Sequence, residues 1–355
     1  MSNTKKKLSS KFITILYLIL FGVVIVASVV IAMYFYRNIK IDTVDEKQKY
    51  DKYYVMITED RDLDLWQSVY EGAKKSGGEQ GIYVELMGEN LYAEYADTDL
   101  LEIAIASKVD GIIVYANESE EMTKLINEAG EAGIPVVTVL GDNTQSTRCS
   151  FVGVGSYNLG REYGKQIVKI VKDKENGDTI SSTHANDVIN VVGIINSYAD
   201  SSTQSIIWSG VQSFVETEND TETSINMSLA YVDNKSTYTV EESIRDIFKN
   251  QDTPDIIVCF NETTTACVYQ SLIDYNMVGK TNLLGYYDSD VILKGISRNV
   301  IYSSVTVDTE QLGNYCVNAL NEYNETGNTS QLFLADITLI DKTNVSEFYQ
   351  EEGEN

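Results

Sequence analysis

The sequence predicts an α/β protein of two lobes, each built on a parallel sheet, with one transmembrane helix at its amino terminus. Short runs rich in Val and Ile alternate with helical stretches along residues 53–345. Most of these runs are apolar without alternation, which is typical of strands buried on both faces of a parallel sheet. Because strand–helix alternation yields parallel sheets, and about ten strands are too many for one comfortable sheet, we expect two Rossmann-like lobes.

The amino-terminal segment predicts the cellular compartment. Residues 12–36 carry no charge, and a helix that spans a bilayer needs about 20 apolar residues. Lysines gather before this run and carboxylates follow soon after it, so the positive-inside rule keeps residues 1–11 as a cytoplasmic tail. The alternative is a cleaved signal peptide, but its apolar region is usually about 7–15 residues long. We therefore expect an uncleaved signal-anchor at 12–36, a linker at 37–52 and an extracytoplasmic domain after it.

The first half of this domain is a repeat of strands and helices. The helix after the first strand places Leu65, Val69 and Ala73 on one face, and a glycine ends the third helix at Gly133. Strands are expected at Tyr53–Ile57, Ile82–Leu86, Gly111–Tyr115 and Pro135–Val139. Helices are expected at Leu65–Ser76, Thr98–Ser107 and Glu120–Ala132.

The second half repeats the same pattern after a fifth strand, with a polar excursion loop at residues 172–187. Strands are expected at Ser150–Val154, Val188–Ile195, Ile225–Tyr231, Asp255–Phe260, Leu283–Tyr287, Tyr302–Val307 and Leu332–Leu339. Helices are expected at Tyr157–Val171, Thr203–Glu216, Val240–Asn250, Thr263–Tyr275, from Val291 onward, and at Thr309–Tyr323.

Composition excludes several classes of function. The chain has 27 Lys and Arg against 53 Asp and Glu, a formal net charge of −26, so no nucleic acid is expected as a partner. The four cysteines form no C-x-x-C pair, which predicts no metal site and no obligatory disulfide. The single histidine, His184, lies in a polar loop, and no G-x-S-x-G elbow exists. We therefore expect no catalytic residue and no cofactor.

A carboxylate run after the first strand resembles a calcium-binding loop. Asp60, Asp62 and Asp64 alternate as calcium ligands would, but Leu65 stands at the sixth position, where an EF-hand needs glycine. The segment also lies between a strand and a helix, so calcium is not expected here.

Polar and aromatic residues follow most of the predicted strands, and ligands of open α/β sheets bind at the carboxyl ends of the strands. Carboxylates and amides can satisfy several hydroxyl groups at once, and aromatic rings suit the C–H faces of a sugar. The alternative for each residue is an ordinary solvated loop side chain. Glu262, Tyr287 and Asp290 stand in the same loops as the chosen candidates. The candidate ligand-binding residues are Asp60, Trp66, Tyr115, Asp142, Tyr198, Asn261 and Asp288.

Several segments together resemble a known family. The runs KVDGIIVYANES, AGIPVVTV, FVGVGSYNLG, IIVCFNETTTACVYQSL and LLGYYDSDVILKGI are similar to type 1 periplasmic sugar-binding proteins. That family includes ribose- and galactose-binding proteins, and it shares its binding domain with lactose-repressor-type regulators. The resemblance covers roughly residues 53–345.

The resemblance implies a two-lobed clamp with a three-strand hinge and a sugar between the lobes. It places the crossovers near Gly155, Val305 and Ala335. Lobe 1 would contain about 53–155 and 307–335, and lobe 2 about 156–306 and 336–345.

The same resemblance implies roles for individual residues. Trp66 falls where the family has a ring-stacking aromatic, and Tyr115 falls where ribose binders place an amide. Asn261 matches a ligand-binding amide directly. Asp288 lies one place beyond the late aspartate of the family, and Asp142 is shifted by two from another.

Taken together, the expected function is that of a membrane-anchored extracytoplasmic solute-binding receptor without catalytic activity. Its partner would be an ABC permease in an importer or a membrane histidine kinase in chemosensing. The alternative is a cell-surface carbohydrate hydrolase in which Asp60, Asp142 and Asp288 converge. A transcription regulator is not expected, because residues 1–50 offer a membrane helix where a DNA-binding head would be needed.

Overall fold

The computed structural model describes residues 22, 28, 50–89, 95–175, 188–197, 201–234, 236–250 and 254–349. The chain divides into one unit up to Lys49 and a second from Tyr50 to the carboxyl terminus. Apart from Gly22 and Ser28, the predicted tail, signal-anchor and most of the linker lie outside the described residues. No helix in the described ranges is long and apolar enough to cross a membrane.

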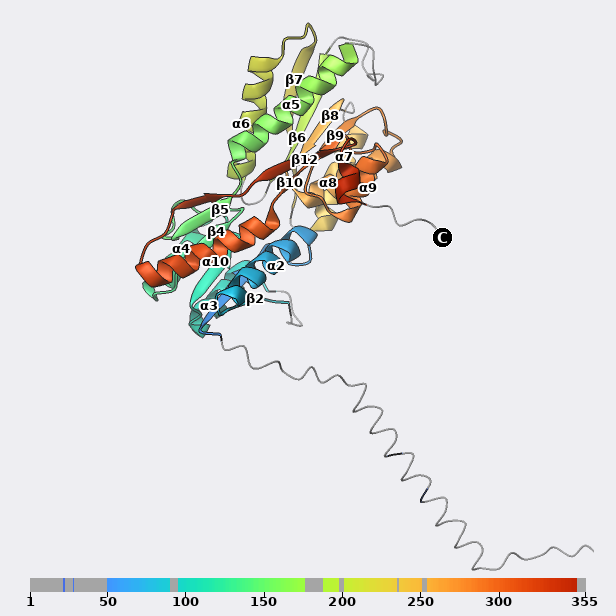
Figure 1. Ribbon diagram of the computed structural model, residues 1–355. Coiled ribbons are helices and arrows are strands. Elements are labelled where there is room, and N and C mark those ends of the chain that lie inside the picture. Colours follow the sequence, from blue (N-terminus) through green and yellow to red (C-terminus); the bar gives the residue numbers. More distant parts are fainter. Residues whose placement is uncertain are drawn as a thin grey trace, which may run out of the picture. The chain divides into compact units, whose positions relative to one another are not determined.

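Lobe 1 of the second unit is a six-stranded parallel sheet with helices on both faces (Figure 1). Its strand order is β11-β5-β4-β3-β1-β2. The strands are β1 (Lys52–Ile57), β2 (Ile82–Leu86), β3 (Gly111–Val114), β4 (Val136–Val139), β5 (Ser150–Gly153) and β11 (Leu332–Leu334). The helices are α2 (Asp64–Glu79), α3 (Asp97–Ser107), α4 (Glu120–Glu131) and α10 (Thr309–Thr326).

Lobe 2 repeats this design with the strand order β12-β10-β9-β8-β6-β7, and only the β10–β12 pair is antiparallel. Its strands are β6 (Val188–Asn196), β7 (Ser224–Val232), β8 (Ile256–Cys259), β9 (Asn282–Tyr286), β10 (Ser303–Val307) and β12 (Ile337–Asp341). Its helices are α5 (Ser156–Glu175), α6 (Ser201–Glu218), α7 (Thr237–Asn250), α8 (Glu262–Asp274), α9 (Asp290–Ser297) and α11 (Val345–Phe348). The predicted α/β fold with two parallel-sheet lobes is therefore confirmed.

Burial explains why the central strands are uniformly apolar. Every residue of β3, β4 and β8 is buried, because helices cover both faces of each sheet. In lobe 1 the face toward α2 and α10 contributes Tyr54 and Met56 to one core cluster, and the opposite face contributes Val55 and Ile57 to a second. Alternate residues of one strand thus serve two hydrophobic cores.

The chain passes between the lobes at three places, and these segments are bonded to one another. The passages lie after β5 near Gly155, at Asp308 between β10 and α10, and at Ala335 and Asp336 between β11 and β12. The amide of Ala335 donates to the carbonyl of Gly153 at 2.8 Å, and that of Asp308 donates to the carbonyl of Asp336 at 2.9 Å. The three segments therefore form one hydrogen-bonded hinge.

One expectation about this hinge is corrected by the structure. The run Leu332–Leu339, predicted as one strand, is two strands in different sheets. It breaks at Asp336, whose backbone N–H and carboxylate bond the amide side chain of Gln311 at 2.9 and 3.0 Å. The second passage, at Asp308, follows β10 and lies within three residues of the expected position near Val305.

Candidate functional site

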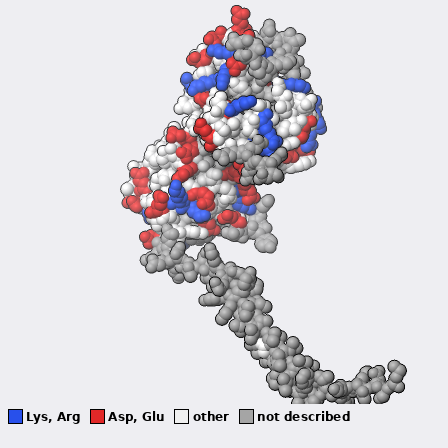
Figure 2. Space-filling model, turned by 45° about the vertical axis from the view of Figure 1, so that its right-hand side comes forward, with Lys and Arg blue, Asp and Glu red and all other residues white. Residues whose placement is uncertain are grey.

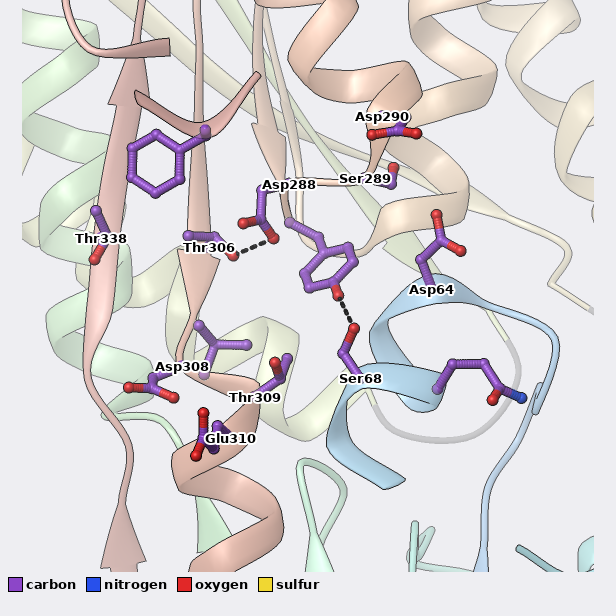
Figure 3. Close-up of a pocket in the computed structure, with 14 residues that line it drawn as sticks. Asp64, Ser68, Asp288, Ser289, Asp290, Thr306, Asp308, Thr309, Glu310 and Thr338 are labelled. Atoms are coloured by element: carbon purple, nitrogen blue, oxygen red, sulfur yellow. Dashed lines mark hydrogen bonds between the residues drawn. The ribbon is translucent and has the colours of Figure 1, made fainter. Parts of the chain in front are cut away.

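The two lobes touch where helix α2 of lobe 1 begins opposite the strand ends of lobe 2. The backbone N–H of Leu65 donates to Glu262 Oε2 at 3.4 Å. The hydroxyl of Tyr287 donates to Ser68 Oγ at 3.0 Å (Figure 3). Ser68 lies one helical turn after Leu65, so both contacts are made by the same face of α2. The first two turns of α2 therefore hydrogen-bond lobe 2.

A cavity of about 660 Å³ opens beside this contact, between α2 and α10 of lobe 1 and the ends of β9, β10 and β12 of lobe 2 (Figure 3). Its lining includes several carboxylates, and none of the described residues that line it is Lys or Arg. The lining residues are Asp64, Gln67, Ser68, Tyr287, Asp288, Ser289, Asp290, Thr306, Val307, Asp308, Thr309, Glu310, Thr338 and Phe348.

Asp288 is the predicted site residue that faces this cavity. Its carboxylate accepts a hydrogen bond from Thr306 Oγ1 at 2.7 Å (Figure 3). Burial raises the pKa of Asp288, and the bond from Thr306 lowers it in part. A carboxylate that is half-buried and keeps free lone pairs can accept hydroxyl groups or face a cation.

Tyr287 is held in an unusual conformation at the same edge. Its φ is +78°, which is costly for an aromatic residue and is found where surrounding contacts enforce it. The backbone N–H of Tyr287 donates to the carbonyl of Val305 at 2.9 Å, and Ser304 Oγ donates to the carbonyl of Tyr287 at 2.6 Å. The side chain is only 5% exposed and points at Ser68.

Trp66 and Tyr115 lie together at the strand ends of lobe 1, but the tryptophan presents no open face. Trp66 is 1% exposed, and its ring meets that of Tyr115 edge-on, with centroids 5.5 Å apart. The resemblance implied a ring-stacking role for Trp66, but in this structure the ring belongs to a hydrophobic core cluster.

Two buried polar atoms stand out at this edge. The indole Nε1 of Trp66 and Oγ1 of Thr58 have no hydrogen-bond partner among the described residues. Leaving a buried donor unpaired costs about 1–3 kcal/mol, so such atoms mark a place suited to a bound polar group. Thr58 follows β1 directly and Trp66 lies in the first turn of α2, so both lie at the edge where sheet ligands bind.

Asp142 has a structural role that the sequence did not reveal. Arg148 forms a two-pronged ion pair with it, through Nε and through Nη2, the latter at 2.7 Å. Thr138 Oγ1 and the backbone N–H of Asn143 donate to the same carboxylate at 2.7 and 2.8 Å. Its oxygens are thus engaged by β4 and by the loop that follows it, and the ligand-binding expectation for Asp142 is corrected.

The remaining predicted residues are spread along the same strand ends. Asp60 accepts a bond from the backbone N–H of Asp62 at 3.2 Å and so stabilises its own turn. Asn261 caps α8 through a bond from the backbone N–H of Thr264 at 2.8 Å and reaches Asn196 through Nδ2 at 3.3 Å. Tyr198 lies outside the described residues.

Of the three carboxylates that the hydrolase alternative requires, Asp288 lines the cavity described above, and Asp60 and Asp142 do not. Asp60 accepts a hydrogen bond from its own turn, Asp142 from Arg148 and Asp288 from Thr306. In the part of the chain that the structure describes, no group of three His, Cys, Asp or Glu residues could hold a metal ion. Glu262 and Tyr287, which join the lobes, are missing from the seven candidates. Their places directly after β8 and β9 are the signal that could have found them.

Charge is unevenly distributed over the molecule. Figure 2 shows Asp and Glu gathered over the lower lobe, which is lobe 1, and more Lys and Arg on the upper one. The face shown has no continuous basic band of the kind that a nucleic-acid backbone needs.

Comparisons with known proteins agree with this architecture. A family model described as a periplasmic binding protein domain matches residues 54–328. GanP, a glucose-galactose binding protein from Geobacillus stearothermophilus, has a TM-score of 0.69 at 21% identity, over 82% of this chain and 98% of that one. An ABC transporter solute-binding protein from Burkholderia graminis in complex with D-arabinose has a TM-score of 0.70 at 16% identity, over 85% and 99%.

A third solved structure is that of XylFII in a complex with LytSN. XylFII has a TM-score of 0.66 at 23% identity, over 82% of this chain and 98% of that one. At these identities the likenesses show the fold. The search of curated proteins found no match.

Proposed function

We propose that this chain, which belongs to the periplasmic binding protein domain family, is a membrane-anchored extracytoplasmic receptor for a sugar or a similar small polar ligand. The observation that carries the proposal is the family match over residues 54–328, which spans nearly all of both lobes. This membership agrees with the resemblance that the sequence predicted. GanP is described as a glucose-galactose binding protein, and the Burkholderia graminis protein is described with D-arabinose, which supports a monosaccharide as ligand.

The ligand would bind between the strand ends of the two lobes and draw them together. Tyr115 would offer aromatic surface from lobe 1, and Trp66 would offer its unpaired indole N–H. Asn261 and Asp288 would accept and donate hydrogen bonds from lobe 2. A ligand that contacts both lobes stabilises the closed arrangement over an open one, and the three-segment hinge permits that motion.

The partner of such a receptor is proposed from the anchor and from one relative. XylFII is described in a complex with LytSN, and other similar structures are described as ABC transporter components. A spanning anchor keeps the receptor beside other membrane proteins. We take this to favour a sensory role with a membrane histidine kinase over a role in delivering ligand to an ABC importer. Genes for a kinase and a response regulator next to this one would support sensing, and permease and ATPase genes would support import.

A thermal-unfolding screen of the full chain in detergent tests the ligand class. Trp66 and Trp208 are buried, so intrinsic fluorescence reports unfolding. A ligand at 100 times its dissociation constant should add about 2.7 kcal/mol of stability. The panel should contain pentoses and hexoses, their amino derivatives because carboxylates line the cavity, and amino acids and nucleosides as comparison compounds. A response to one monosaccharide is expected, and a response confined to amino acids or nucleosides would contradict a sugar receptor.

A further inference from the structure

We propose that Glu262 is a positioning residue for lobe closure, which caps helix α2 across the lobe boundary and makes closure dependent on pH. The inference rests on the proposed receptor function only in assuming that the lobes open and close. It concerns a residue that touches the partner lobe, whether or not it touches the ligand.

Helix α2 lacks a cap of its own. The residue before it, Leu63, makes no side-chain bond to the first turn, although the first N–H groups of any helix have no partner within the helix. The backbone N–H of Leu65 is one of these groups, and it donates to Glu262 Oε2 of the other lobe at 3.4 Å. The cap of α2 is therefore present only when the lobes are together.

The position of Glu262 explains why a carboxyl group is suited to this contact. Glu262 is the first residue of α8 and is 7% exposed. Its side chain reaches the amino-terminal end of α2. A carboxyl group keeps an oxygen that can accept the Leu65 N–H in both its ionised and its neutral form, so this contact does not require the charge of Glu262.

A second contact on α2 reinforces the first. Tyr287 reaches Ser68 with its hydroxyl, while its backbone holds a φ of +78°. Both lobe 2 residues stand at the ends of neighbouring strands, β8 and β9, and both meet the first two turns of α2. Together they form an interlobe latch, defined here as Glu262 with Leu65 and Tyr287 with Ser68.

The surroundings of Glu262 give the latch its dependence on pH. Burial is the largest cause that raises the pKa of Glu262, and the carboxylates of Asp64 and Asp288 raise it further. Hydrogen bonds from Leu65 and Ser289 act in the opposite direction. On the side of α7, Glu241 and Arg245 face the same 580 Å³ cavity as Glu262.

Lobe closure depends on pH because the pKa of Glu262 differs between the closed and the open arrangement. When the lobes separate, Glu262 gains access to water and its pKa returns toward the ordinary glutamate value. The closed arrangement therefore binds the proton more tightly than the open one. Closure is most favoured below the ordinary pKa and weakens as pH rises through the raised pKa.

The test measures the distance between the lobes in the full chain, without any ligand. Spin labels are attached at two exposed positions, through Glu102→Cys in lobe 1 and Lys280→Cys in lobe 2, in a Cys149→Ser background. The other three cysteines are buried. In the otherwise unchanged chain, the population at short distance should fall as pH rises from 4 to 8.

Three further variants separate the parts of the proposal. Glu262→Gln keeps an oxygen acceptor but cannot titrate, so its distance distribution should not change with pH. Glu262→Ala should broaden the distribution at every pH and speed amide exchange in the first turn of α2 by roughly tenfold, because one cap bond is lost. Tyr287→Phe removes only the second contact and should give an intermediate broadening.

Glu241→Gln is the matched control, since it neutralises a carboxylate of the same cavity on the α7 side. It should behave as the unchanged chain. Unchanged distances and exchange in both Glu262→Ala and Tyr287→Phe would overturn the latch. A pH response that persists in Glu262→Gln would overturn the role of Glu262 in the pH dependence. None of these measurements needs a sugar. The latch proposal can therefore fail while the proposed ligand class stands, and the reverse is also true.

Discussion

At the scale of single residues, Trp66 shows why burial must guide the choice of substitution. Trp66 is 1% exposed within the core, so Trp66→Ala would lower the free energy of unfolding by about 3–5 kcal/mol. A loss of ligand binding in that variant could then result from unfolding. Trp66→Phe keeps an aromatic ring and removes the unpaired N–H. We expect this variant to unfold near the temperature of the unchanged chain and to lose about tenfold in affinity for the sugar found by the screen.

Isothermal titration calorimetry measures that affinity, and circular dichroism measures the unfolding temperature. An affinity equal to that of the unchanged chain would show that the indole N–H does not meet the ligand.

Asp142 belongs to the same scale, and its role is structural. Its ion pair with Arg148 is about five-sixths buried, with side-chain exposures of 16% and 17%. We expect Asp142→Asn to lower the free energy of unfolding by about 1–3 kcal/mol, because Arg148 would keep its charge without a carboxylate. Urea unfolding measures the change.

The control for Asp142 is Glu128→Gln, which breaks the exposed pair with Lys124. Exposed pairs contribute at most about 1 kcal/mol, so this variant should remain close to the unchanged chain. Equal effects in the two variants would contradict the structural role of Asp142.

At the scale of elements, the contact between α5 and α6 depends on the absence of a side chain at one point. A Cβ built on Gly160 would lie 2.0 Å from the carbonyl oxygen of Ile207, in the backbone of the neighbouring helix. The two helices must therefore move apart in Gly160→Ala, although alanine favours helix formation. We expect a loss of about 1–3 kcal/mol in the free energy of unfolding.

Gly130→Ala in α4 provides the comparison for Gly160, since its nearest neighbour is Oγ1 of Thr147 at 3.0 Å, the end of a side chain. A side chain can rotate away, so this variant should stay within about 1 kcal/mol of the unchanged chain. If Gly160→Ala were equally mild, the close packing of α5 on α6 would not be as described.

At the scale of the whole molecule, the fold was predictable because its strands are covered on both faces. Full burial requires continuous apolar runs such as GIIV in β3, and these are visible without a structure. The break in the last strand was less visible. LFLADITLI has the hydrophobic pattern of one strand, and the family resemblance, not this pattern, places a crossover near Ala335, where the chain changes sheets.

The site was predictable in its location but not in the role of each side chain. The sequence shows which residues follow each strand, so the loops that hold Asp288 and Glu262 could be named. The hydrogen-bond partner of a side chain depends on the three-dimensional structure. Nothing in the sequence says that Arg148 occupies both oxygens of Asp142, or that the ring of Trp66 is buried in the core.

The arrangement of the whole chain across the membrane gives the last prediction. Lysines before residues 12–36 and the strong acidity after them should hold the tail inside the cell and the binding domain outside. A protease added to intact cells that carry the chain should therefore digest the domain and leave a short membrane-bound fragment with the intact amino terminus. Replacing Lys5, Lys6, Lys7 and Lys11 by Glu should reduce the fraction that is digested, because the charge bias that sets the orientation is removed. A domain protected from protease in the unchanged chain would refute the proposed orientation. A mature amino terminus after Ala27 would show a cleaved signal instead, and the receptor would then act free of its own anchor.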